Sequence, residues 1–535
     1  MIKFIKKNLD IIVTVLILII IISLNIQPDK IIMGLDNSSP FFQPFEIFKR
    51  IKGTSSIIYG GLIFQLPFLG SLSKLGIGPE LLSNIFVFSN LITGTLGISF
   101  LLKRSFKRTS IIILGVIIFL TNLFLFWIFG NPNFLFIVSF GTIPIIIYLL
   151  SSKNLTWFHW LLLSIFSISF LTTTLNIVAF TLYLLCIICL SLIFNKNKKS
   201  LYKRLSMWII ALLIFWFGSI QIIMVNNQDK TFFPIQIYEY TQELIDNPYV
   251  TSNTEGIIAS KRTNTLIRTM SFALGWMELH DSNDIPIFEN YTLYRENLLY
   301  IILGTIPFLL AILAVFLEPN KKTILLTISL ISFVLISSKY GISIIEKIPY
   351  IQSSLRWISS KLWPLFIIPL IILSTTTLNE LTKNKSTLIK FLSLSLILVI
   401  LCIYGSPILN KHLLAPKTLV NIPSEYFEIP NDSSILILPI PQRSYMREYD
   451  WGYYGSDFLV HITNSEIIDG ANLFEYGERY SDILTNENIS VDIDYVIYNT
   501  SAEINLPDEL KDKSQLLLNG LKLISSNEYF TIYER

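Results

Sequence analysis

The sequence QPDKIIMGLDNSSPFFQPFEIFKRIKGTSS occupies residues 27 to 56 and follows directly on the first apolar run of the chain. Its first half carries two acids, Asp29 and Asp36. Its second half places three phenylalanines and a lysine at spacings of four, three and four residues, at Phe41, Phe45, Phe48 and Lys52. Side chains at these spacings share one face of a helix, and a helix with such a face can lie on a membrane surface. The stretch therefore predicts acids held close to lipid.

The composition agrees with a membrane protein. Hydrophobic residues make up 52% of the 535 residues, charged residues make up 15%, and the mean hydropathy is +0.58. Such a chain is too apolar for an ordinary soluble protein and uses lipid as solvent for much of its length. The net charge of +3 arises from 41 basic and 38 acidic side chains. This balance does not indicate a nucleic-acid partner.

The apolar runs predict about eleven transmembrane helices. The first run, at about 11–26, follows three lysines and lacks a small-residue cleavage site, so we expect an uncleaved helix with a cytoplasmic amino terminus. Ten further runs have the length that crosses a ~30 Å hydrocarbon core. These runs lie at about 80–102, 109–129, 133–150, 155–175, 176–194, 205–225, 298–317, 322–338, 362–378 and 388–406.

Basic residues in alternate connections support this order of helices, because cytoplasmic loops collect lysine and arginine. The basic connections carry Lys103, Arg104, Lys107 and Arg108, then Lys153, then Lys196, Lys198, Lys199, Lys203 and Arg204, then Lys321 and Lys322, then Lys383 and Lys385. The remaining connections then face outward, with large external loops at 27–79 and 226–297. We expect the apolar segment 56–72 to be re-entrant or to lie on the surface, since a full crossing would reverse every later loop.

The chain divides into a predicted transmembrane domain, 1–406, and an exported α/β or β-rich domain, 407–535. Runs of strand length at 434–439, 494–498 and 528–533 carry this prediction. Between the first two runs lies an aromatic cluster with Trp451, Tyr453 and Tyr454. Two interpretations of this cluster remain open: a packed turn, and a surface that stacks on sugar rings.

Two classes of transport protein are disfavoured. The sequence has no G-K-[ST] motif, so an ATP-driven pump is not indicated. The interiors of the apolar runs hold almost no charge, whereas ion-coupled transporters place ionisable groups at that depth. A small-solute transporter therefore stays a minor alternative.

The arrangement resembles the GT-C class of membrane glycosyltransferases that use polyprenyl-phosphate sugars. Three short motifs look most like the large arabinofuranosyltransferase-type bacterial membrane proteins: Gly34-Leu35-Asp36-Asn37 followed by Pro40, Leu355-Arg356-Trp357, and the aromatic run from Tyr449 to Gly455 after Leu438-Pro439-Ile440-Pro441. The resemblance implies that Asp36 acts as the catalytic base and that Arg356 grips the donor phosphate. The sequence departs from the class in having no tight pair of acids, so metal dependence stays open.

The chemistry of sugar transfer asks for the same residue types. A carboxylate takes the proton of the acceptor, and cations stabilise the phosphate leaving group. Asp36 can supply the first, and Arg356 with Lys347 or Lys361 can supply the second. Asp36 can equally cap a helix or turn. Asp29 is a secondary candidate that can instead pair with Lys30.

The long external loop offers further polar candidates. Glu278, His280, Asp281 and Asp284 include ligands that a divalent cation accepts, although a solvated turn is the simpler interpretation. Arg268 and Arg295 flank this group and are secondary candidates for meeting phosphate. No metal site or cofactor is assigned.

These observations predict a glycosyltransferase that works on the outer face of the cytoplasmic membrane. Its expected partners are the bilayer, a polyprenyl-phosphate-linked sugar, and a glycan, lipid or protein acceptor. The alternative is a non-enzymatic membrane protein that binds or translocates a polyprenyl-linked glycan.

Overall fold

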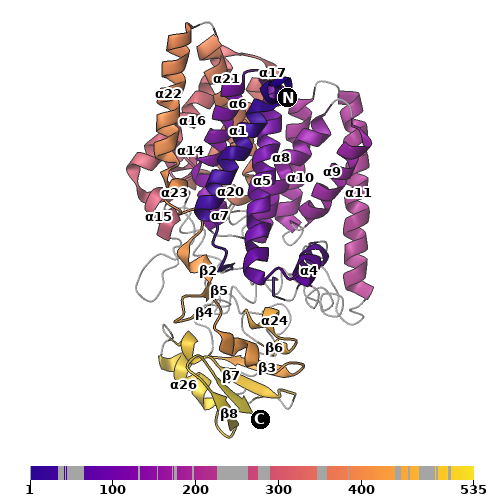
Figure 1. Ribbon diagram of the computed structural model, residues 1–535, viewed down its shortest axis with the longest axis vertical. Helices are drawn as coiled ribbons and strands as arrows, with labels where there is room; N and C mark the ends of the chain where they lie inside the picture. Colours follow the sequence, from indigo (N-terminus) through magenta and orange to yellow (C-terminus); the bar gives the residue numbers. More distant parts are fainter. Residues whose placement is uncertain are drawn as a thin grey trace.

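The computed structural model has a helical body joined to a smaller sheet region at one end (Figure 1). The residues that it describes are 2–33, 41–42, 44, 65–130, 133–152, 155–171, 173, 177–195, 198–225, 263–274, 289–345, 347, 358–383, 385–439, 447–455, 458–468, 489, 492–503, 506 and 508–535. Most apolar side chains of the helical body belong to one continuous core. The predicted fold class, a helical membrane protein with a carboxyl-terminal mixed domain, is confirmed at this level.

Four described helices are long and apolar enough to cross a membrane: α1 (Ile2–Asn25), α5 (Pro79–Ser105), α16 (Leu298–Leu317) and α21 (Pro364–Lys383). Two bent pairs meet the same test, which makes up to six spans. They are α6 (Thr109–Leu120) with α7 (Leu123–Gly130), bent by 47°, and α17 (Lys321–Ser337) with α18 (Lys339–Ile345), bent by 70°. The other long helices are α8 (Phe134–Ser151), α9 (Trp157–Phe170), α10 (Ile177–Phe194), α11 (Lys198–Val225) and α22 (Thr387–Tyr404).

A helix or a bent pair thus lies at each of the eleven predicted apolar runs. The run 109–129 needs a correction, because it is two helices and not one straight span. Asn122 interrupts it: the Phe124 N–H donates to Oδ1 of Asn122 at 2.8 Å, the bond that an N-cap residue makes at the start of a new helix. The sequence is apolar on both sides of Asn122, so its hydropathy does not reveal the break.

The tightest packing in the bundle is between α5 and α8. A Cβ built on Gly94 would lie 2.6 Å from the carbonyl oxygen of Phe140, and one on Gly97 would lie 2.7 Å from the backbone nitrogen of Ile145. Only glycine permits so close an approach of two backbones. The close contact fixes α5, whose amino-terminal end carries part of the candidate site.

The segment that follows the helices contains a five-stranded mixed sheet in the order β6-β3-β7-β9-β8. Its strands are β3 (Ser434–Leu438), β6 (Glu466–Ile468), β7 (Tyr495–Tyr498), β8 (Lys522–Ser526) and β9 (Thr531–Glu534). β3 pairs in parallel with β6 and β7, while β9 is antiparallel to β7 and β8. The parallel centre explains why the sequence of β3 is apolar throughout, since all five of its residues are buried.

Short elements connect the two parts. The strand β1 (Ile31–Ile32) pairs antiparallel with β2 (Leu419–Val420), which joins the segment after α1 to the segment before the sheet. The remaining elements are α4 (Leu66–Lys74), α14 (Leu266–Met270), α15 (Glu289–Glu296), α20 (Ile358–Leu362), α23 (Ser406–Leu409), η2 (Pro416–Thr418), η3 (Ser424–Glu428), β4 (Arg447–Glu448), β5 (Tyr454–Gly455), α24 (Leu459–Ile462), η4 (Thr500–Ala502) and α26 (Asp508–Leu516).

Helix α4 covers the described part of the segment predicted to be re-entrant or superficial. Its nine residues span about 14 Å, less than half of a ~30 Å hydrocarbon core. It lies at the end of the helical body that faces the sheet (Figure 1). Leu66 and Leu69 are buried while Phe68 is exposed, so α4 packs on the bundle by one face.

Candidate functional site

Asp36 and Arg356, the two leading candidates, lie outside the described residues, and their roles stay predictions. The residues that flank Asp36 are described on both sides. Before it, the N–H of buried Met33 donates to the carbonyl oxygen of Thr418 at 3.0 Å. After it, the buried ring of Phe41 packs on Phe86 of α5 with centroids 5.8 Å apart. The residue before this segment therefore contacts the connection to the sheet, and the residue after it contacts the helical body.

Asn84 of α5 holds the chain that leads to Asp36. Its buried side chain donates through Nδ2 to the carbonyl oxygens of Gln27 (2.9 Å) and Lys30 (3.2 Å), and its Oδ1 accepts from the Gln27 N–H (3.3 Å). Ser83 adds a bond from the Ile32 N–H to its Oγ at 3.0 Å. The turn also keeps its own backbone bond, from the Lys30 N–H to the carbonyl oxygen of Gln27 at 3.1 Å, so the Asn84 amide adds a second set of contacts that ties the turn to α5. The sequence analysis did not predict this role for Asn84. The one feature that could have indicated it is that Asn84 is a polar residue in an apolar run.

Asn25 at the end of α1 fixes the connection to the sheet. Its Nδ2 donates to the carbonyl oxygen of Ile408 at 3.1 Å, and its Oδ1 accepts from the Leu413 N–H at 3.2 Å. From α15, Nδ2 of Asn290 donates to the carbonyl oxygen of Leu414 at 3.2 Å. Two asparagines therefore anchor the connection on α1 and on α15. The secondary candidate Asp29 lies on the exposed turn between α1 and β1.

The two secondary arginines meet at one carboxylate. Arg268 makes a bidentate contact with Glu296, from Nη1 to Oε1 at 2.9 Å and from Nη2 to Oε2 at 2.5 Å. The Nε of Arg295 also donates to Oε1 of Glu296 at 2.9 Å. The side chains of Arg268, Arg295 and Glu296 are 20%, 3% and 44% exposed. The hydrogen bond from Arg268 holds the pKa of Glu296 below its ordinary value, against the opposing effect of burial. The sequence pointed to both arginines and not to Glu296.

A strained turn positions Arg268. Phe272, shortly after α14, has a φ of 58°, a left-handed conformation that costs an L-residue roughly 1–2 kcal/mol. Two tyrosine hydroxyls stabilise this turn: Tyr291 donates to the carbonyl oxygen of Leu274 at 2.9 Å, and Tyr404 donates to that of Ser271 at 3.2 Å. The turn thereby ties α14 to α15, which carries Arg295.

The two lysine candidates differ in environment. Lys347 is exposed, whereas Lys361 of α20 is 3% exposed. The backbone beside Lys361 is fixed, because the Tyr183 hydroxyl donates to the carbonyl oxygen of Ser360 at 2.8 Å. Ionisable groups buried in a membrane bundle are costly and are usually retained for function. Of the two predicted phosphate contacts, the one by Lys361 is therefore the more informative to test.

The aromatic cluster near the sheet is largely core. Tyr453 and Tyr454 are buried, and Trp451 is partly exposed. The rings of Trp451 and Tyr453 stack at 5.5 Å with an interplanar angle of 10°, and Phe458 meets both edge-on. Sugar stacking by these residues stays a prediction, and Trp451 is the ring of the three with the most open surface.

The described residues hold no group of three or more His, Cys, Asp or Glu side chains suited to a metal ion. The predicted cluster around His280 lies outside them, so metal dependence stays open.

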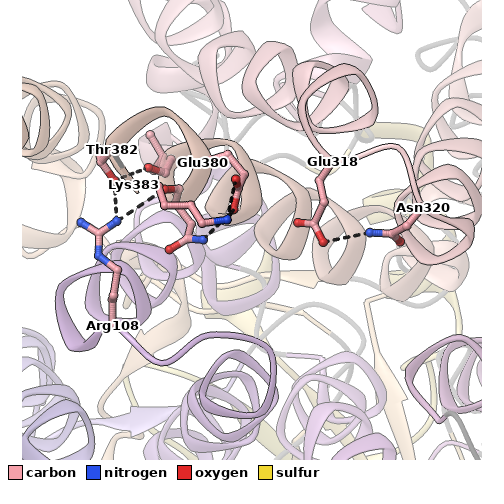
Figure 2. A network of polar contacts seen from close by, with 8 residues as sticks. Arg108, Glu318, Asn320, Glu380, Thr382 and Lys383 are labelled. Atoms are coloured by element: carbon pink, nitrogen blue, oxygen red, sulfur yellow. Dashed lines mark hydrogen bonds and ion pairs between the residues drawn. The ribbon is translucent and has the colours of Figure 1, made fainter. Parts of the chain in front are cut away.

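A second polar network joins the residue before α6 to the last turns of α21 (Figure 2). Nη1 of Arg108 donates to Oγ1 of Thr382 at 2.8 Å and to the carbonyl oxygen of Asn379 at 3.4 Å, near the carboxyl end of α21. Lys383 pairs with Glu380 at 3.2 Å. These contacts satisfy and complement the negative end of a helix. They give Arg108 and Lys383 partners within the protein.

The comparisons with known proteins identify the fold. No protein-family model and no curated protein sequence matches the chain. A single-particle cryo-EM structure of a mutant arabinofuranosyltransferase AftD from Mycobacteria superposes on 99% of this chain with a TM-score of 0.59 and 11% sequence identity. A second class of the same mutant gives a TM-score of 0.48. The chain spans 41% of the length of that enzyme. The chain therefore has the GT-C-like fold of an arabinofuranosyltransferase, as the resemblance predicted.

Proposed function

We propose that this protein transfers a sugar from a polyprenyl-phosphate donor to an envelope glycan, lipid or protein on the outer face of the cytoplasmic membrane. One observation supports the proposal most. The acid-bearing segment after α1 is anchored at Met33 to the connection that leads to the sheet and at Phe41 to α5, in a fold similar to that of a membrane arabinofuranosyltransferase. Such anchoring holds the two described ends of the segment that carries Asp36.

In this proposal Asp36 takes the proton of the acceptor hydroxyl as the hydroxyl attacks the anomeric carbon. The bond to the donor phosphate breaks, and cations stabilise the polyprenyl phosphate that leaves. Arg356 is the leading candidate for that contact, with Lys361 and Lys347 as further candidates. The amino terminus lies in the cytoplasm, and the sheet region is exported to the side where donor and acceptor meet.

The test is transfer by the purified full-length chain in lipid vesicles. The donors are polyprenyl-phosphate-linked radiolabelled sugars, beginning with arabinofuranose, and the acceptors are envelope glycans. Asp36→Asn keeps the size and capping ability of the side chain but cannot accept a proton, so transfer should fall on the order of 10²–10⁴-fold. Asp508→Asn, at an exposed position of α26, is the matched control. Wild-type rates in Asp36→Asn would remove Asp36 from catalysis.

The same assay separates the enzyme from the alternative. A wild type that retains the lipid-linked sugar but transfers none of it from any donor would contradict the transferase proposal. That result would favour a protein that binds or translocates a polyprenyl-linked glycan.

A further inference from the structure

Helix α11 begins with basic residues that have no acid near them in the sequence. No Asp or Glu occurs between Glu80 and Asp229, although this stretch carries the basic residues of three predicted cytoplasmic connections. The first turns of α11 run Lys198-Lys199-Ser200-Leu201-Tyr202-Lys203-Arg204. The positive end of the helix dipole lies at the same place, so the helix adds to this charge instead of offsetting it. The start of α11 is therefore a strongly positive part of the protein.

The cations of this helix divide between two of its faces. Arg204 belongs to the buried face, and its Nη1 donates to the carbonyl oxygen of Ser152 after the end of α8. Lys199 and Lys203 are exposed on another face. Among the described residues neither lysine forms an ion pair or a hydrogen bond. Arg204 therefore serves the packing of the bundle, whereas the two lysines direct their charge away from the protein.

The face that carries the two lysines continues as an apolar surface. It carries exposed side chains at Lys199, Lys203, Met207, Ile210 and Ile214. Their spacings of four, four, three and four residues place them within about 80° of one another around a helix with 3.6 residues per turn. The exposed residues Tyr202, Ser206 and Leu213 border them. Met207 follows Lys203 by about 6 Å along the axis, so the face passes from charge to hydrocarbon within a little more than one turn.

Helix α9 brings an exposed tryptophan to the level of the lysines. The indole Nε1 of Trp208 in α11 donates to Oγ of Ser167 in α9 at 2.7 Å, so the two helices lie side by side, at the margin of the helical body (Figure 1). Trp157 lies ten residues before Ser167, and Lys198 lies ten residues before Trp208. Both are therefore about 15 Å along their helices from this bond. Trp157 is 78% exposed, and tryptophan beside lysine is typical of the boundary between membrane and water.

We infer that this surface of α11 and α9 binds an anionic phospholipid of the cytoplasmic leaflet. The phosphate contacts Lys199 and Lys203, and the acyl chains lie on the aliphatic side chains that follow. A basic connection alone orients a membrane protein, whereas a lipid site also needs the apolar continuation that α11 supplies. A zwitterionic lipid has the same acyl chains but no net charge, so the lysines select against it. This binding does not depend on the proposed transfer reaction.

The experiment counts the lipids that stay bound. The purified full-length chain is reconstituted in nanodiscs with equal amounts of phosphatidylglycerol and phosphatidylcholine, and native mass spectrometry measures the lipids retained on the released protein. We expect phosphatidylglycerol to be preferred about tenfold or more, since two lysines contribute roughly fivefold each. Equal retention of the two lipids would overturn the inference. Displacement of the retained lipid by inorganic phosphate or by a heparin fragment would also overturn it, because the surface would then be a site for soluble anions.

Paired variants test the lysines. Lys199→Gln with Lys203→Gln removes both charges and should bring the ratio of the two retained lipids close to one. Lys199→Arg with Lys203→Arg keeps the charges and should keep the preference. The matched control is Lys383→Gln with Lys385→Gln, which removes two cations from another predicted cytoplasmic connection, where Lys383 pairs with Glu380. An equal loss in this control would show that net charge, and not the surface of α11, selects the lipid.

The position of the lipid is tested separately. A phosphatidylglycerol with a photoactivatable group on its headgroup should cross-link to the start of α11 or of α9, and cross-links confined to other helices would overturn the location. Each variant should melt at the wild-type temperature in pure phosphatidylcholine, because both lysine side chains are exposed. A lower melting temperature moves the test to the single variant Lys203→Gln, which should lower the preference about fivefold. An unchanged preference in that variant would contradict the inference.

Discussion

The N–H of Leu413 donates a hydrogen bond of 3.2 Å to Oδ1 of Asn25, although the two residues are 388 positions apart. Nδ2 of the same amide donates to the carbonyl oxygen of Ile408, so one side chain at the end of α1 satisfies a donor and an acceptor of the connection to the sheet. Both of these hydrogen bonds are buried. A polar pair this distant in sequence joins the start of the chain to its last third.

The first prediction follows from this pair. Asn25→Leu should lower the free energy of unfolding by about 1–3 kcal/mol for each backbone group left buried and unpaired. The melting temperature in detergent measures the loss, and limited proteolysis measures release of the sheet region. Ser23→Ala is a suitable control, because among the described residues the exposed Ser23 donates to the carbonyl oxygen of Ile20 in its own helix and to nothing else. Equal melting temperatures for wild type and Asn25→Leu would show that other contacts hold the connection.

The second prediction concerns the crossing of α5 and α8. Gly94→Ala should destabilise the bundle by about 1–3 kcal/mol, because the added methyl group would meet backbone at Phe140 and the helices must move apart. Gly130→Ala is the matched control, since a Cβ at that position has no neighbour within 4 Å in the part of the chain that the structure describes. The melting temperature of Gly94→Ala should be lower than that of Gly130→Ala. Equal melting temperatures would mean that α5 and α8 have room for a methyl group between them at this crossing.

The helices and the principal strands could be predicted from the sequence because burial in lipid or in a parallel sheet leaves a continuous apolar run. This is why β3 and β7 lie where the runs at 434–439 and 494–498 predicted them. The break at Asn122 and the bond to Asn84 could not be predicted in this way. A single polar residue in an apolar run leaves hydropathy almost unchanged, and its partner is set by the three-dimensional packing. The role of Glu296 was hidden for the same reason, since Arg268 is far from it in sequence.

The third prediction concerns membrane orientation. We expect a cytoplasmic amino terminus and an exported sheet region, so a cysteine introduced at Asn197 should be shielded from an impermeant thiol reagent in intact cells, while one at Ser456 should react. The natural cysteines, of which Cys189 and Cys402 are exposed on their helices, should first be replaced by alanine. Equal labelling at both positions would contradict the predicted order of eleven helices.

The fourth prediction is a pH dependence that comes from Glu296. Because Arg268 lowers its pKa in the folded protein, ionised Glu296 stabilises the fold at pH values above its ordinary value of 4.5. That stabilisation is lost as the pH falls through the lowered pKa. The difference in melting temperature between wild type and Glu296→Gln should be constant above pH 4.5 and should shrink below it. Glu380→Gln removes the ion-pair partner of the exposed Lys383, within one turn of α21, and should show a much smaller effect than the loss of a carboxylate that two arginines contact. A difference that does not vary with pH would show that the charge of Glu296 is not what stabilises the cluster.

The last prediction concerns Asn499, which follows β7 in the sheet. Its backbone is fully used, since its N–H donates to the carbonyl oxygen of Leu438 at 2.8 Å and its carbonyl oxygen accepts from the Ala502 N–H at 3.1 Å. Its side chain is completely buried, and among the described residues neither Oδ1 nor Nδ2 has a hydrogen-bond partner. An amide buried in this way costs about 1–3 kcal/mol.

Asn499→Leu keeps the approximate size and removes that cost, so the sheet should become more stable by up to the same amount. Asn499→Asp should do the opposite, because it buries a charge. Hydrogen exchange of the amides of β7 and β9 in the full-length protein measures the stability of the sheet apart from that of the bundle. Slower exchange in Asn499→Leu and faster exchange in Asn499→Asp are expected. Faster exchange in Asn499→Leu would show that the amide is paired in solution, with buried water as the partner of suitable size.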